Sequence, residues 1–267
     1  MKSNPCFIIA HRYVRGYTSY IKHYIENIIK FYETPLIIVV DNNSLHKEEV
    51  FDSLEKKSNI ILLDNNTEHK FEQGAYLVGL NYILNNNLLH HYDYYVFTQD
   101  TYILKNKYDF DELEKNNVFA CPISWGEGNQ DLSMGLITPH LINLGLNDMN
   151  VEVNYNHHFV DSNSYTEDVI NKILHCYCNC YIVSKTKIKE LHGYVSKIKI
   201  TTRYESELCE RYFAWVLYKL NEYKNYQIDH NPYRLYECHG NLNLHSDFNH
   251  GYFAKHQQQK RETTLEL

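Results

Sequence analysis

Short apolar runs alternate with amphipathic segments over the first hundred residues of the chain. The apolar runs are rich in Ile, Val, Leu and aromatic residues and stop at polar residues: 7–10 (FIIA), 36–40 (LIIVV), 60–63 (IILL) and 94–98 (YYVFT). Continuous runs of this kind are typical of strands buried on both faces. The segments 17–32, 47–57 and 71–84 between them carry apolar residues at helical spacing. Alternating strands and helices predict an α/β fold, with a mostly parallel central sheet flanked by helices.

The second half of the chain has a weaker pattern. We expect strands at 118–123 and 175–184, and helices at 185–192 and 205–219, the first of them closed by Gly193. Residues 124–168 are rich in Asn, Asp, His and Gly, which predicts long functional loops with short elements. The last residues, QQQKRETTLEL, are expected to be peripheral.

Three of the first four predicted strands end in an acidic residue: Asp41, Asp64 and Asp100. In parallel sheets of this class, ligands bind outside the carboxyl ends of the strands. Asp is also a common turn and cap residue, so a single strand ending in Asp carries no information. Three such endings on one edge of a sheet favour a binding site there.

Charge and length exclude several classes of protein. The 267 residues carry a formal net charge of −7 and no basic stripe, which argues against nonspecific nucleic-acid binding. The first residues, MKSNPCFIIAHRYVRGY, lack the pattern of a signal peptide, and no apolar run approaches the ~20 residues of a membrane span. We therefore expect a cytoplasmic protein without a transmembrane segment.

The seven cysteines are an odd number in a chain without an export signal, which predicts reduced thiols. Cys176, Cys178 and Cys180 invite a metal-site interpretation. On the strand expected here, however, this spacing puts all three side chains on one face, whereas a zinc site favours turn-spaced pairs. Buried strand cysteines are the favoured interpretation.

The order of these landmarks resembles the GT-A family of nucleotide-sugar glycosyltransferases over roughly residues 6–220. The segments that carry the resemblance are FIIAHRY, LIIVVDNNS, EQGAYLVGL, YYVFTQD, CYCNCYIVSKTKIKELHGY and ESELCERYFAW. The resemblance implies a single domain over 1–267, with a nucleotide-binding half to about residue 105, an acceptor-side half over about 106–256 and a peripheral tail at 257–267. Its substrates would be a nucleotide-sugar donor and a glycan or other hydroxyl acceptor.

The resemblance also implies which residues bind the donor. It places the nucleotide at the ends of the first strands and at the glycine-bearing helix start, namely at Ala10, His11, Arg12, Asp41, Asn42, Asp64, Gln73, Gly74, Gln99 and Asp100. Asp41 would accept hydrogen bonds from the nucleobase or ribose, as acidic residues at this position do in other doubly wound sites.

A divalent cation, Mn²⁺ or Mg²⁺, would neutralise the leaving diphosphate. The family's D-x-D motif has two acids, whereas Thr98-Gln99-Asp100 supplies one. The match places Asp100 at the last Asp, a direct metal ligand, and Thr98 at the first position, where a water could bridge. His239 is the expected late metal ligand, since the Gly that follows it allows close backbone approach. The alternative is that Asp100 caps a turn.

An inverting transfer needs a general base for the acceptor hydroxyl. Glu207 and Glu210 stand three apart, on one face of a predicted helix, and Glu207 fits the family position better. Acidic residues also favour helix starts for purely electrostatic reasons, and this alternative stays open. Trp125 and Glu127 fall near the expected acceptor position, where an aromatic ring could stack on a sugar; packing is the alternative for Trp125.

Two other functions remain possible. A nucleotidyltransferase that makes activated sugars would use a related sheet and metal, but its Gly-rich phosphate loop is missing from Ala10–Gly16, which contains a single Gly. A non-catalytic binding protein with a glycosyltransferase fold would account for the incomplete D-x-D motif. The oligomeric state is open.

Overall fold

The computed structural model describes residues 4–13, 21–52, 54, 58–123, 176–226, 228 and 253–255. Within them, a six-stranded sheet has the order β3-β2-β1-β4-β7-β6. Its strands are β1 (Pro5–His11), β2 (Leu36–Asp41), β3 (Ile60–Asp64), β4 (Tyr94–Gln99), β6 (Ala120–Pro122) and β7 (Tyr181–Ser184). The first four strands along the chain pair in parallel, while β7 runs antiparallel to both β4 and β6. The predicted α/β fold with a mostly parallel sheet is confirmed.

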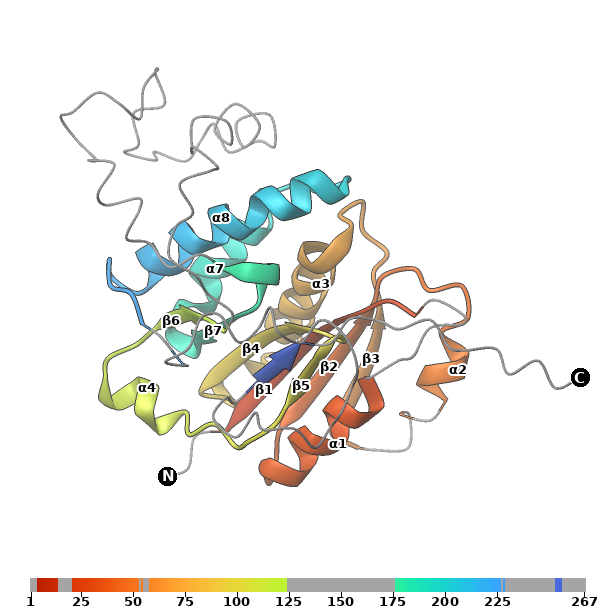
Figure 1. Cartoon of the computed structure of the whole chain (residues 1–267), viewed down its shortest axis with the longest axis horizontal. Coiled ribbons are helices and arrows are strands. Elements are labelled where there is room, and N and C mark those ends of the chain that lie inside the picture. Colours follow the sequence, from red (N-terminus) through yellow and green to blue (C-terminus); the bar gives the residue numbers. More distant parts are fainter. Residues whose placement is uncertain are drawn as a thin grey trace, which may run out of the picture.

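Helices cover both faces of this sheet (Figure 1). On one face lie α3 (Phe71–Asn85), α7 (Ile188–Val195) and α8 (Arg203–Leu220), whose apolar residues form one core with strand residues such as Ile8 and Val40. On the other lie α1 (Ile21–Phe31), α2 (Glu48–Phe51) and α4 (Asp111–Lys115), which pack with residues such as Phe7 and Val39. Neighbouring strand residues thus belong to opposite cores, as the two-residue period of a strand requires.

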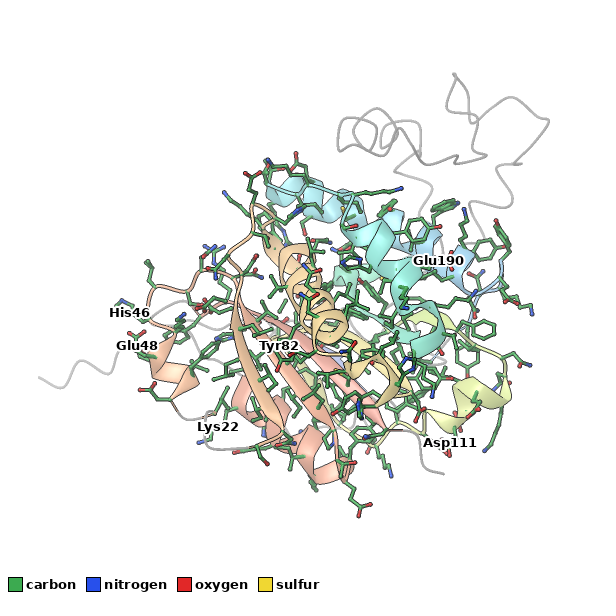
Figure 2. The ribbon with its side chains drawn as sticks, turned by 180° about the vertical axis from the view of Figure 1, so that it is seen from behind. Lys22, His46, Glu48, Tyr82, Asp111 and Glu190 are labelled. Atoms are coloured by element: carbon green, nitrogen blue, oxygen red, sulfur yellow. The ribbon has the colours of Figure 1, made fainter. Side chains whose placement is uncertain are left out.

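The view from behind shows the outer surfaces of α3 and α7, marked by Tyr82 and Glu190 (Figure 2). Both β1 and β2 are buried along their whole lengths, because helices cover both faces and strands flank both edges. This double burial explains why their sequences are continuously apolar rather than alternating.

Short elements complete the described fold. The strand β5 (Tyr102–Leu104) pairs antiparallel with β8 (Phe253–Lys255), and three 3₁₀ turns are η1 (Leu88–His90), η3 (Tyr177–Asn179) and η4 (Lys185–Lys187). Across all described residues, none of the helices combines the length and apolarity that a bilayer crossing requires.

The structure corrects several expected elements. The strand expected at 175–184 is present only as β7, because Cys178 in η3 has φ 57° and breaks the extended backbone. The prediction that three cysteines share one strand face is therefore wrong. Gly193 lies inside α7 and does not close it. The helix expected at 47–57 shrinks to α2 among the described residues, and neither β5 nor β8 was expected.

Candidate functional site

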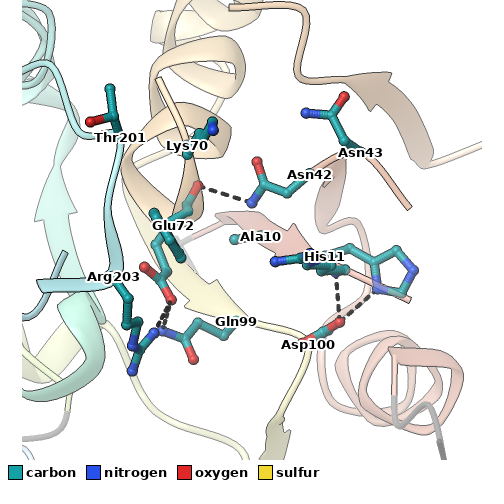
Figure 3. Close-up of a pocket in the computed structure, with 12 residues that line it drawn as sticks. Ala10, His11, Asn42, Asn43, Lys70, Glu72, Gln99, Asp100, Thr201 and Arg203 are labelled. Atoms are coloured by element: carbon teal, nitrogen blue, oxygen red, sulfur yellow. Dashed lines mark hydrogen bonds and ion pairs between the residues drawn. The ribbon is translucent and has the colours of Figure 1, made fainter. Parts of the chain in front are cut away.

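A cleft of about 620 Å³ opens at the carboxyl ends of β1, β2 and β4. Its size is within the usual range for a small-molecule site, roughly 300–1,000 Å³. The residues that line it come from three strand ends and two helix starts: Ala10, His11, Arg12, Asn42, Asn43, Lys70, Phe71, Glu72, Gln99, Asp100, Thr201 and Arg203 (Figure 3). Six of the predicted donor residues are among them, namely Ala10, His11, Arg12, Asn42, Gln99 and Asp100.

Parallel pairing brings these strand ends together. In the register, His11 on β1 lies opposite Asp41 on β2, and Ala10 lies opposite Gln99 on β4. The backbone continues this alignment beyond the strands, since Asp100 N–H donates to the Ala10 carbonyl at 2.9 Å. The three strands therefore end at nearly the same level, where their following residues can meet one ligand.

Asp100 is held by two hydrogen bonds to the same oxygen. Its Oδ2 accepts from the backbone N–H of Arg12 at 3.0 Å and lies 2.8 Å from Nδ1 of the buried His11. Thr98 does not share this environment: it is fully buried and accepts a hydrogen bond from the Tyr24 hydroxyl on α1. Thr98 is not among the described residues that line the cleft, and the expected water bridge from it to a cation stays a prediction.

A network of asparagines connects β2 to the start of α3. Asn42 donates from Nδ2 to the Phe71 carbonyl at 2.9 Å and accepts from Asn65 Nδ2 at 2.8 Å. Asn65 also donates to the His69 carbonyl at 2.8 Å. Phe71 has a positive φ of 58°, which is uncommon for a non-glycine residue and is a feature that gathers at functional sites. These bonds fix the Asn42 side chain at the cleft wall.

Glu72, the next residue of α3, joins three elements at the cleft. Its Oε1 accepts from Gln99 Nε2 at 2.8 Å and lies 3.8 Å from Arg203 Nη1, and its Oε2 accepts from the Ser206 hydroxyl at 2.8 Å. Gln99 Nε2 also donates to the Cys178 carbonyl at 2.8 Å. The network ties the start of α3, the end of β4 and the start of α8 to one another.

Three cationic side chains line the cleft, from Arg12, Lys70 and Arg203, against the two carboxylates of Glu72 and Asp100. The start of α3, from Lys70 to Glu72, also lines the cleft. A helix amino terminus and nearby cations both favour a negatively charged ligand. The cleft is thus suited to an anion that also needs hydrogen-bond partners.

Four predicted donor residues do not line the cleft. Asp41 is buried, and its two oxygens accept from the backbone N–H and hydroxyl of Ser44 at 2.8 and 2.5 Å. Asp64 pairs with Lys47 at 2.5 Å on the surface. Gln73 and Gly74 are buried beside the helix start. Both oxygens of Asp41 thus already accept a hydrogen bond from Ser44, and a further hydrogen bond from the nucleobase or ribose to Asp41 stays a prediction.

The remaining predicted residues lie elsewhere or outside the described part. Glu210 does not line the cleft, and its Oε1 accepts from the backbone N–H of Cys178 at 2.8 Å. Glu207 belongs to α8, but its side chain is outside the description, as are Trp125, Glu127 and His239 altogether.

The described cysteines are free thiols, and most of them are buried. Burial raises the pKa values of the Cys176 and Cys209 thiols, so both stay protonated near neutral pH.

Among the described residues, no group of three His, Cys, Asp or Glu side chains is arranged to hold a metal ion. In the described part of the chain, the carboxylates that line the cleft are those of Glu72 and Asp100.

Sequence reasoning missed half of the cleft residues: Asn43, Lys70, Phe71, Glu72, Thr201 and Arg203. A signal for some of them was present. Thr202 and Glu205 form a capping box, whose Thr-x-x-Glu spacing marks the start of α8 at Arg203. Because the sequence analysis began this helix at Glu205, it assigned neither Thr201 nor Arg203 to the helix start.

Comparisons with known proteins give matches among solved structures. No family model matches the sequence, and no curated protein matches it either. One similar structure is core-mannan synthase A from Aspergillus fumigatus in a Mn/GDP form, with 10% identity and a TM-score of 0.35 over 85% of this chain and 73% of that one. Another is a mannosyltransferase from S. cerevisiae in complex with GDP, with 13% identity and a TM-score of 0.38 over 84% and 68%. These similarities are too distant to carry an inference about function.

Proposed function

We propose that this chain is a glycosyltransferase that moves a sugar from a nucleotide-diphosphate donor to a hydroxyl acceptor. The observation that carries the proposal is the cleft at the carboxyl edge of the sheet, where Asp100 stands among Arg12, Lys70 and Arg203. A diphosphate needs several positive groups, and a nucleoside needs hydrogen-bond partners at a strand end. Both requirements meet in this one cleft.

The cationic side chains would bind the diphosphate. Lys70 and Arg203 enter the cleft from the starts of α3 and α8, so a phosphate between them would also meet the amino end of α3. When the sugar leaves, negative charge increases on the diphosphate, and these cations stabilise it. Asn42, Asn43 and the backbone of β1 would contact the nucleoside.

Asp100 would orient the donor and supply one oxygen to a divalent cation, Mn²⁺ or Mg²⁺. When bound, such an ion neutralises charge on the leaving phosphates. His239 is the proposed second protein ligand. For the acceptor hydroxyl, Glu207 remains the proposed base and Glu210 the alternative, with Trp125 and Glu127 on the acceptor side.

Calorimetric titration of the protein with UDP and with GDP, each with and without Mn²⁺, tests donor binding. We expect binding of one of them, and its loss or marked weakening in Asp100→Asn. Asp109→Asn is the matched control, because Asp109 is exposed and does not line the cleft. No heat from either nucleotide under either condition would contradict the proposal.

A second measurement separates transfer from other reactions of the same cleft. Nucleotide-sugars are incubated with the protein and release of the nucleoside diphosphate is followed. Release supports a transferase, whereas binding without release in the presence of candidate acceptors favours a binding protein. Release of pyrophosphate from a sugar phosphate and a nucleoside triphosphate would instead identify a nucleotidyltransferase.

A further inference from the structure

His11 and Asp100 form a buried pair at the edge of the cleft. The imidazole is fully buried, its Nδ1 lies 2.8 Å from Asp100 Oδ2, and its ring stacks on Phe51 with centroids 5.8 Å apart. Figure 3 shows the His11 ring on the far side of Asp100 from Glu72 and Arg203, so the ring supports Asp100 from behind. His11 is therefore placed to act on Asp100 rather than on a ligand.

The hydrogen bonds divide the two oxygens of Asp100 between separate tasks. Oδ2 accepts hydrogen bonds from the His11 ring and from the Arg12 backbone N–H. Among the described residues, Oδ1 makes no hydrogen bond. A carboxylate fixed through one oxygen presents the other in a set direction. Asp100 is almost buried, so the oxygen that remains faces the cleft that Asp100 lines.

The tautomer of His11 follows from its surroundings. His11 Nε2 is buried and has no hydrogen-bond partner among the described residues. A hydrogen on Nε2 would be a buried donor without an acceptor, which is costly. A hydrogen on Nδ1 instead donates to Asp100, and Phe51 covers the ring face. Ring and carboxylate thus fix each other.

We propose that His11 is a positioning residue: its Nδ1–H holds Asp100 so that Oδ1 points to the divalent cation that would accompany the donor diphosphate. This inference rests on the proposed function for its ligand, but the hydrogen bond itself can be tested without one. The proposed role requires a hydrogen-bond donor at the position of Nδ1. It also predicts that every effect of His11 on the reaction depends on Asp100.

Nitrogen-15 NMR of the imidazole rings tests the hydrogen bond in the full chain without any substrate. The His11 signals are assigned by their loss in His11→Asn. We expect hydrogen on Nδ1 and none on Nε2. Hydrogen on Nε2, alone or together with Nδ1, would overturn the inference whatever reaction the protein performs.

Kinetics with a nucleotide-sugar test the consequence. His11→Leu removes the donor and keeps an apolar side chain against Phe51, whereas His11→Asn keeps an N–H close to the position of Nδ1. We expect kcat/KM to fall about 10- to 100-fold in His11→Leu, the usual range for losing a hydrogen bond to a charged group, and to be largely restored in His11→Asn. Urea unfolding of both variants checks that they are folded.

The double variant decides between positioning and an independent role. In an Asp100→Asn background, His11→Leu should change kcat/KM by less than about threefold, because its effect passes through Asp100. The inference would be refuted if the two substitutions lowered kcat/KM by the product of their separate effects. Unchanged kcat/KM in a folded His11→Leu protein would also refute it. If the wild-type protein binds no nucleotide, the proposed function fails, and the NMR result alone then decides the role of His11.

Discussion

Replacing Gly74 by Ala tests the packing that builds the cleft. Gly74 is in the first turns of α3, and a Cβ there would lie 2.3 Å from the His69 carbonyl oxygen and 2.4 Å from Asn65 Nδ2. Neither atom can withdraw easily, because one belongs to the backbone and the other bonds both that carbonyl and Asn42. The substitution must therefore move the helix start or break the asparagine network.

The expected cost follows from three contributions. Overpacking of a buried position costs about 1–3 kcal/mol. Loss of the Asn65 to His69 hydrogen bond adds about 1 kcal/mol. Ala is a better helix former than Gly by about 1 kcal/mol, which offsets part of this. We expect Gly74→Ala to lower the free energy of unfolding by about 1–3 kcal/mol, the sum of these terms.

Urea denaturation followed by circular dichroism measures the change, and Gly193→Ala is the matched control. Gly193 is also inside a helix, α7, but a Cβ there would meet no atom within 4 Å. This variant should be stabilised by about 0.5–1 kcal/mol, since it gains helix propensity without a clash. A Gly74→Ala protein as stable as wild type would refute the packing argument.

Two further predictions concern the start of α8. Arg203→Gln should weaken binding of the nucleoside diphosphate that the protein binds, UDP or GDP, about fivefold at low salt, an amount suited to an exposed cation, while Lys189→Gln on α7 should not; calorimetry measures both. Burial acts to raise the pKa of Glu205, but hydrogen bonds from Thr201 and Thr202 to its carboxylate lower that pKa overall. Because these bonds favour the ionised form, their stabilisation is present above the ordinary Glu pKa of about 4.3 and is lost as pH falls through the lowered folded-state value. The difference in unfolding free energy between wild type and Glu205→Gln should therefore shrink from about pH 7 to about pH 3, and a constant difference would contradict this.

The parallel part of the fold was predictable because strands buried on both faces have continuously apolar sequences. The segments LIIVV and YYVFT are β2 and β4 within one residue. The prediction of a strand over 175–184 was wrong because apolar composition does not reveal backbone dihedral angles. Cys178 adopts a positive φ, which interrupts the extended backbone. The reversal of β7 was also hidden, since strand direction depends on how the preceding chain returns to the sheet.

At the site, the sequence was informative where position along a strand decides which residues lie together. Ala10, Gln99 and Asp100 line the cleft because parallel strands end together. The position of Asp41 outside the cleft lining could not be predicted, since the sequence does not show that Ser44, three residues later, would donate hydrogen bonds to its carboxylate. The sequence analysis also passed over Arg203, which reaches the cleft through a contact between segments more than a hundred residues apart.

The Glu72 network has a consequence for the order in which the molecule is assembled. Glu72 bonds Gln99, 27 residues further on, and Ser206, 134 residues further on. During synthesis, β1 to β4 are complete by residue 99, whereas the Ser206 hydroxyl, which donates to this carboxylate, is synthesised about a hundred residues later. The four strands β1 to β4 can therefore pair before α8 has been made, whereas this part of the cleft is complete only after α8 docks on the sheet.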